Sequence, residues 1–192
     1  MIVLVAALGG GFIAGLLMGG SFANLDRLSL RLAWAAVLAL LLQLVAFSPL
    51  GAPLPEAGMV AMHLASYALL LAFVVANIRR PPVVCFGAGV VCNVLAIVVN
   101  GGYMPARRGA LLLAGLPVSD TPHNNSLLAG SGAHLVALGD VFAVPHWVPF
   151  ANVFSVGDVL IACGLAWLIA QTMRAPRPRD AQDTVVSGPS EA

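Results

Sequence analysis

The sequence contains no lysine, and charged residues make up only 9% of its 192 residues. Soluble domains usually carry about 25% charged residues. Hydrophobic residues account for 60% of the chain, and its mean hydropathy is +0.96. This composition excludes an ordinary soluble domain and predicts a protein that crosses a membrane several times. The net charge of +1 gives no indication of nucleic-acid binding.

Cysteine is also scarce, and the three cysteines all lie inside apolar stretches. Cys85 and Cys92 would be about 10 Å apart along a helix axis, which is too far for a disulfide. No Cys-x-x-Cys pair and no His/Cys spacing typical of a metal site occurs in the chain. We therefore expect the cysteines to be small packing residues, and we predict neither a metal nor a cofactor.

Five apolar stretches come close to the roughly 20 residues that a membrane-spanning helix requires. They comprise residues 2–19, 32–47, 59–76, 83–99 and 151–170. These stretches predict an all-α fold, a polytopic bundle of about five transmembrane helices within one domain of residues 1–170. The segment 100–150 contains two shorter apolar pieces, which we expect to lie at the interface. A sixth crossing by residues 127–142 is a less favoured alternative, because glycine, serine and histidine interrupt it.

The arginines predict the orientation of this bundle. If the C-terminus is cytoplasmic, seven of the nine arginines lie inside, namely Arg27, Arg31, Arg79, Arg80, Arg174, Arg177 and Arg179. Only Arg107 and Arg108 then lie outside, as the positive-inside rule requires. We therefore expect the N-terminus outside, the segment 100–150 outside, and residues 171–192 as a disordered cytoplasmic tail. The expected location is the plasma (inner) membrane.

Glycines recur every four residues in the first apolar stretch, at Gly11, Gly15 and Gly19. Such spacing forms a groove that lets another helix approach closely. The groove indicates packing within the bundle or, alternatively, a dimer contact.

Asp158 is the most unusual polar residue, because it lies within the last apolar stretch. A carboxylate at that depth costs about 2.5–3.5 kcal/mol on insertion scales, so an intramembrane acid suggests a functional site. Asp140 precedes it across a short segment rich in proline and aromatic residues. Asn152, Ser155 and Asp158 recur every three residues, which would place them on one face of the fifth helix.

Other polar residues gather on the same predicted side. Asn100 and Tyr103 belong to the motif NGGYMP, Arg107 follows it, and the four histidines of the chain all fall there: His63, His123, His134 and His146. His134 is the strongest candidate of these four, since it lies six residues before Asp140. We take Asn100, Tyr103, Arg107, His134, Asn152 and Ser155 as candidate binding residues.

Two resemblances rest on these motifs. The Gly-rich first stretch together with NGGYMP, LGDVFAVP and NVFSVGD resembles an uncharacterised family of bacterial multi-pass membrane proteins, a domain-of-unknown-function group that implies no activity. The segment WVPFANVFSVGD is similar to the last helix of lipoprotein signal peptidases, over the C-terminal third of the chain. That second resemblance implies that Asp158 is one of two catalytic aspartates and that Asp140 is its partner.

Three hypotheses about function follow. The favoured one is a membrane protein that binds or assists a lipid-linked or envelope component, with Arg107 and Arg108 as contacts for an anion. Its partners would be membrane lipid, a lipid-linked substrate or a membrane partner protein. The alternative is an aspartyl-type membrane hydrolase, in which Asp140 and Asp158 act as general base and acid. In the third, the two acids only hold the helices together.

Overall fold

The computed structural model describes residues 2–46, 48, 50, 53–118, 126–130 and 132–174, and within these the chain is mostly helical. The α-helices are α1 (Ile2–Leu17), α2 (Ala33–Ala46), α3 (Glu56–Ala76), α4 (Pro81–Val99), α5 (Arg108–Ala114) and α6 (Val156–Met173). Two short 3-10 helices complete the set, η1 (Phe22–Arg27) and η2 (Val136–Leu138). His123 and the predicted tail beyond residue 174 lie outside the described residues.

Each of the five predicted spans corresponds to a helix. Three of them, α3, α4 and α6, are long and apolar enough to cross a membrane, which indicates a membrane protein. The helices α1 and α2 are apolar but shorter. The last helix begins at Val156 rather than at residue 151, because residues 152–155 form a strand. The stretch 127–142 holds parts of two strands and one short 3-10 helix but no long helix among its described residues.

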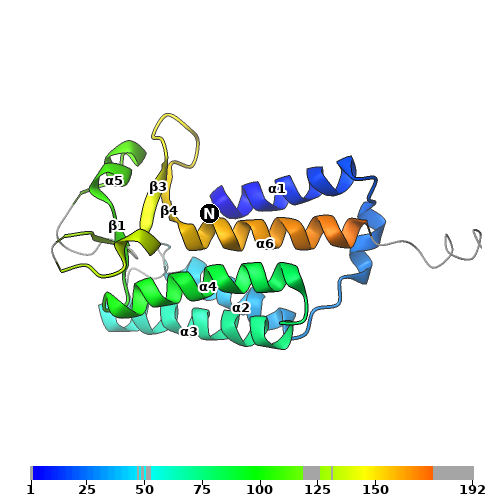
Figure 1. The fold of residues 1–192 in the computed structure, drawn as a ribbon. Helices are drawn as coiled ribbons and strands as arrows, with labels where there is room; N and C mark the ends of the chain where they lie inside the picture. Colours follow the sequence, from blue (N-terminus) through cyan, green and yellow to red (C-terminus); the bar gives the residue numbers. More distant parts are fainter. Residues whose placement is uncertain are drawn as a thin grey trace, which may run out of the picture.

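The helices pack in the order α1, α6, α4, α3, α2, so that α6 lies between α1 and α4 (Figure 1). The predicted glycine groove explains one of these contacts. A Cβ atom at Gly11 would lie 2.9 Å from the backbone of Ala166, and one at Gly15 would lie 2.5 Å from Met173 Sδ. Gly19 lies beyond the end of α1, and a Cβ atom there would meet nothing within 4 Å. The groove therefore consists of Gly11 and Gly15, and α6 fills it, which confirms packing within the bundle.

Helix α4 is apolar on two faces. Val83, Val90 and Ile97 recur every seven residues and are fully buried against the neighbouring helices. Its outward face is also apolar: the exposed fractions of Val84, Val91, Leu95 and Val98 are 44–55%. A helix that is hydrophobic all round suits lipid rather than water.

A small sheet corrects the all-α prediction. Its strands are β1 (Met104–Ala106), β2 (Ser126–Leu128), β3 (Asp140–Val144) and β4 (Asn152–Ser155), in the order β2-β1-β3-β4. Strand β1 runs parallel to β2 and β3, and β4 pairs with β3 in antiparallel fashion. The strands have three to five residues, too few to display a clear alternation of apolar and polar side chains.

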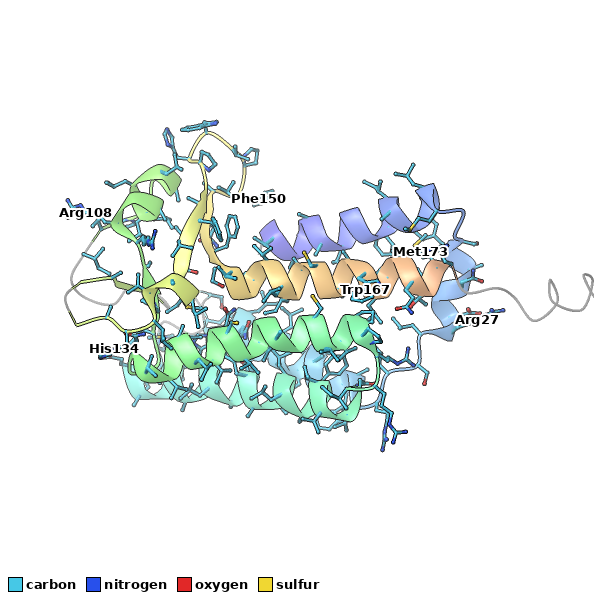
Figure 2. The ribbon with its side chains drawn as sticks, viewed as in Figure 1. Arg27, Arg108, His134, Phe150, Trp167 and Met173 are labelled. Carbon is cyan, nitrogen blue, oxygen red and sulfur yellow. The ribbon has the colours of Figure 1, made fainter. Side chains whose placement is uncertain are left out.

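The sheet and α5 form a cap at one end of the bundle, here called the sheet end (Figure 1). The cap has a core of its own, made by Ala106, Ala110, Leu111, Ala114 and Val153. The opposite end, here called the arginine end, carries η1, the turn between α3 and α4, and the end of α6 (Figure 2). The described arginines there are Arg27, Arg31, Arg79, Arg80 and Arg174.

Candidate functional site

Helix α6 starts with a capping box made by Ser155 and Asp158. The Ser155 hydroxyl accepts a hydrogen bond from the Asp158 backbone N–H at 3.0 Å, and Asp158 Oδ2 accepts one from the Ser155 N–H at 2.9 Å. These bonds satisfy backbone donors that a helix start leaves without partners. One carboxylate oxygen of Asp158 is therefore used to begin the helix.

The second oxygen of Asp158 is held by Asn93 of α4. Asn93 Nδ2 donates to Asp158 Oδ1 at 2.9 Å, and the Ser155 hydroxyl donates to Asn93 Oδ1 at 2.8 Å. Asn93 is 1% exposed and Ser155 is fully buried. The close approach of α4 to the start of α6 requires glycine at position 157, since a Cβ atom there would lie 2.0 Å from Asn93 Oδ1. The three polar side chains therefore join α4 to the start of α6.

Asp140 lies beside this group because of the strand register. It is the first residue of β3, its Cα is paired with that of Ser155 in β4, and it is 6% exposed. Its backbone oxygen accepts a hydrogen bond from the Arg107 N–H at 3.0 Å. The sheet thus brings the two predicted aspartates to one place, between the cap and the bundle.

Tyr67 of α3 completes the group. It is 8% exposed, and its hydroxyl interacts with Asn93 and lies within electrostatic range of both Asp158 and Asp140. We call Tyr67, Asn93, Asp140, Ser155 and Asp158 the junction cluster. It joins α3, α4, α6 and the sheet through buried polar groups, as inward-facing polar residues of membrane helices commonly do.

Two members of the junction cluster, Asn93 and Tyr67, were not among the predicted site residues. Each lies inside a long apolar stretch, and neither belongs to a recognisable motif. Their signal is depth alone, because a polar residue in the middle of a membrane helix almost always faces protein.

Asn152 does not share the face of Asp158, so that prediction is wrong. It begins strand β4, where side chains alternate instead of recurring every three to four residues. Its side-chain oxygen accepts a hydrogen bond from the neighbouring Val153 N–H at 2.9 Å. The Asn152 side chain therefore bonds to the backbone of β4 itself.

Asn100 and His134 meet away from the junction cluster, at the end of α4. Asn100 Nδ2 donates to the backbone oxygens of Ala96 and His134 at 2.7 and 2.8 Å, and the His134 N–H donates to Asn100 Oδ1 at 2.8 Å. The imidazole of His134 takes no part in these bonds and is exposed. Asn100 thus fixes the loop that leads into β3.

Tyr103 fastens the cap to α3. Its hydroxyl donates to Glu56 Oε1 at 2.5 Å. Partial burial and the Glu56 carboxylate raise the pKa of Tyr103 to about 12, because both favour the neutral phenol.

Of the predicted histidines, His63 is buried in α3 against the Tyr67 ring, with ring centroids 5.2 Å apart.

Arg107 and Arg108 are both exposed at the start of α5. Arg108 and Leu112 lie one helical turn apart, on the same face of α5. The exposed residues of this region also include apolar and aromatic side chains, namely Leu112, Leu113, Trp147 and Phe150. The hairpin between β3 and β4 contacts α5 through the His146 N–H, which donates to the Leu113 oxygen at 2.9 Å. Figure 2 shows Arg108 and Phe150 at the sheet end.

A family model described as "Family of unknown function (DUF5317)" matches residues 27–170, well over half of the chain. The chain belongs to this family. The DUF5317 match includes all five residues of the junction cluster and the whole cap. Comparison with curated proteins and with solved structures finds no match. Within the described residues, no group of three or more His, Cys, Asp or Glu side chains is arranged to hold a metal ion.

Proposed function

We propose that the protein is a plasma-membrane protein with five membrane-spanning helices, whose sheet end faces outward and binds a lipid-linked or envelope component. The orientation rests on the positive-inside rule. Five described arginines lie at the arginine end, against Arg107 and Arg108 at the sheet end. The N-terminus of α1 lies near the sheet end (Figure 1), so the proposed orientation would have it outside.

The lengths of the helices are compatible with five crossings. At 1.5 Å per residue, the 21 residues of α3 extend for about 32 Å, close to the thickness of the hydrocarbon core. The 16 residues of α1 and the 14 of α2 extend for about 24 and 21 Å. Such shorter helices are accommodated by local thinning of the bilayer or by their flanking residues.

The observation that carries the proposed ligand is the exposed pair Arg107 and Arg108 beside exposed apolar side chains of the same cap. A lipid-linked molecule combines an anionic head with an acyl chain, so it matches both parts of this surface. Arginine binds phosphate and carboxylate with paired, charge-assisted hydrogen bonds. The exposed aromatic rings of Trp147 and Phe150 suit the region between lipid and water.

The test is recovery of the ligand with the purified protein. We expect native mass spectrometry of the protein, extracted in mild detergent, to detect a co-purified lipid-linked molecule. Replacing both arginines, in Arg107→Ala/Arg108→Ala, should remove it, whereas the control Arg174→Ala at the other end should retain it. Equal retention by the double variant and the control would contradict the proposal.

The convergence of Asp140 and Asp158 favours a second candidate, an aspartyl-type hydrolase acting on a lipid-linked substrate. Its difficulty is Asp158, both of whose oxygens already accept hydrogen bonds from Asn93 and Ser155. A general base must reach the proton that it abstracts, directly or through one water. We therefore prefer binding to hydrolysis.

Incubation with a membrane-lipid extract distinguishes the two functions. Hydrolysis predicts a product whose appearance stops in Asp140→Asn and in Asp158→Asn while both variants still fold. Binding predicts recovery of the same molecule with unchanged mass. Binding also predicts that Arg107→Ala reduces the amount of bound molecule more than Asp140→Asn or Asp158→Asn does.

A further inference from the structure

The arginine end contains a pocket that the proposed function does not use. Its volume is about 360 Å³, and three arginines line it: Arg27 at the end of η1, and Arg79 and Arg80 in the turn between α3 and α4. The last turns of α6 supply Leu168, Gln171 and Thr172. Segments that lie far apart in the sequence therefore meet around one cavity. Figure 2 shows Arg27 and Met173 at this end of the molecule.

The pocket is strongly positive. None of the described residues that line it is acidic, while three carry a guanidinium group. Helix α4 adds the positive end of its dipole, because it begins at Pro81 directly after Arg80. Arg79 and Arg80 are neighbours in the chain, so an anion in this cavity would be attracted by two guanidinium groups at once.

The geometry also holds part of the pocket in place. Arg80 Nη2 donates to the backbone oxygen of Ser29 at 2.6 Å, which orients the guanidinium and leaves further N–H donors on it. The end of α6 is fixed to η1, because the Met173 oxygen accepts hydrogen bonds from Asn24 Nδ2 at 2.7 Å and from the Ser21 N–H at 2.9 Å. The pocket is therefore already formed before an anion binds.

We propose that this arginine pocket binds a phosphate group, supplied by an anionic phospholipid. Guanidinium groups pair with phosphate oxygens in a fork geometry through two parallel, charge-assisted hydrogen bonds. The pocket lies where the apolar helix α4 begins and α6 ends, at the level expected for lipid headgroups. Leu168 gives it an apolar side, which suits the glycerol and the first carbons of an acyl chain. Free phosphate shares the charge but lacks this apolar part.

The experiment uses the full chain in detergent and measures its melting temperature with added lipid. We expect phosphatidylglycerol to raise the melting temperature in a saturable manner, and neither phosphatidylcholine nor inorganic phosphate at the same concentration to do so. Stabilisation by inorganic phosphate alone would retain a phosphate site but overturn its assignment to lipid. No stabilisation by any of the three would overturn the proposal. These comparisons need no variant, so they do not depend on one that folds.

Matched variants locate the effect. Arg79→Gln should weaken binding of phosphatidylglycerol by about tenfold or more, because one charge-assisted hydrogen bond is worth at least that factor. The control Arg31→Gln removes an equal charge at the same end, where Arg31 uses only its backbone to bond to Asn77. It should leave binding within about twofold of the wild type. Equal weakening of phosphatidylglycerol binding by both variants would show general electrostatic attraction to this end of the molecule, and it would overturn the assignment of the pocket as the binding site.

Discussion

Removal of the Asn93 side chain should destabilise the protein more than removal of the amide of Gln43 in α2. Asn93 makes two hydrogen bonds to α6, at 2.9 Å to Asp158 and at 2.8 Å from Ser155. Hydrogen bonds between membrane helices are worth about 0.6–1.7 kcal/mol each. Asn93→Ala also leaves a carboxylate oxygen of Asp158 without this partner, which adds about 1–3 kcal/mol. We therefore expect a loss of about 2–6 kcal/mol in the free energy of unfolding.

The matched control is Gln43→Ala. Gln43 of α2 donates one hydrogen bond of 2.9 Å to the Ser66 hydroxyl, and no charged group depends on it. Removal of the Gln43 side chain should lower the free energy of unfolding by less than about 1.7 kcal/mol. Unfolding of both variants in mixed detergent micelles gives the comparison. A loss for Asn93→Ala no larger than that for Gln43→Ala would refute the junction cluster as the contact that joins α4 to α6.

A double-mutant cycle tests the same contact without reference to absolute stability. Asn93→Ala and Ser155→Ala remove the two ends of one hydrogen bond. Their combined effect should therefore differ from the sum of the single effects by about 0.5–3 kcal/mol. Simple additivity would mean that the two side chains do not interact in the folded protein.

Two further predictions concern the same region and the cap. Gly157→Ala places a methyl group 2.0 Å from the asparagine oxygen of the junction cluster, so it should lower the melting temperature. Gly9→Ala, with nothing within 4 Å, should leave it unchanged or raise it, since alanine favours a helix by about 1 kcal/mol. In a Tyr67→Phe background, ultraviolet titration should show Tyr103 ionising near pH 12. The additional change Glu56→Gln should lower the pKa of Tyr103, and an unchanged pKa would refute the hydrogen bond between Tyr103 and Glu56. Because folding raises the pKa of Tyr103, its contribution to stability is complete below about pH 10 and declines as the pH rises towards 12.

The sequence predicted the helices well because long apolar stretches have few alternative structures. It identified the glycine groove of α1, but it placed Asp158 eight residues into the last span, whereas Asp158 is the third residue of α6 and lies in its first turn. It missed the sheet, since strands of three to five residues carry little periodicity. That omission also misplaced Asn152, which was assigned to a helix face although it begins a strand.

The convergence of the aspartates could be suggested from sequence, but its cause could not. Asp140 reaches Ser155 through the register of β3 and β4, a pairing that no local pattern specifies. The pattern Ser-x-x-Asp at the start of α6 was a usable signal for a capping box, and it explains one oxygen of Asp158. The contact with Asn93 depends on how α4 packs against α6, so only the structure reveals it.

The side of the membrane that the cap faces decides the central claim, and cysteine labelling measures it directly. In a cysteine-free background, Gly109→Cys would mark the sheet end and Ser29→Cys the arginine end, both at exposed positions. A maleimide that cannot cross membranes should label Gly109→Cys in cells with an intact plasma membrane, and Ser29→Cys only after permeabilisation. Labelling of Ser29→Cys in intact cells, with Gly109→Cys protected, would contradict an outward-facing cap.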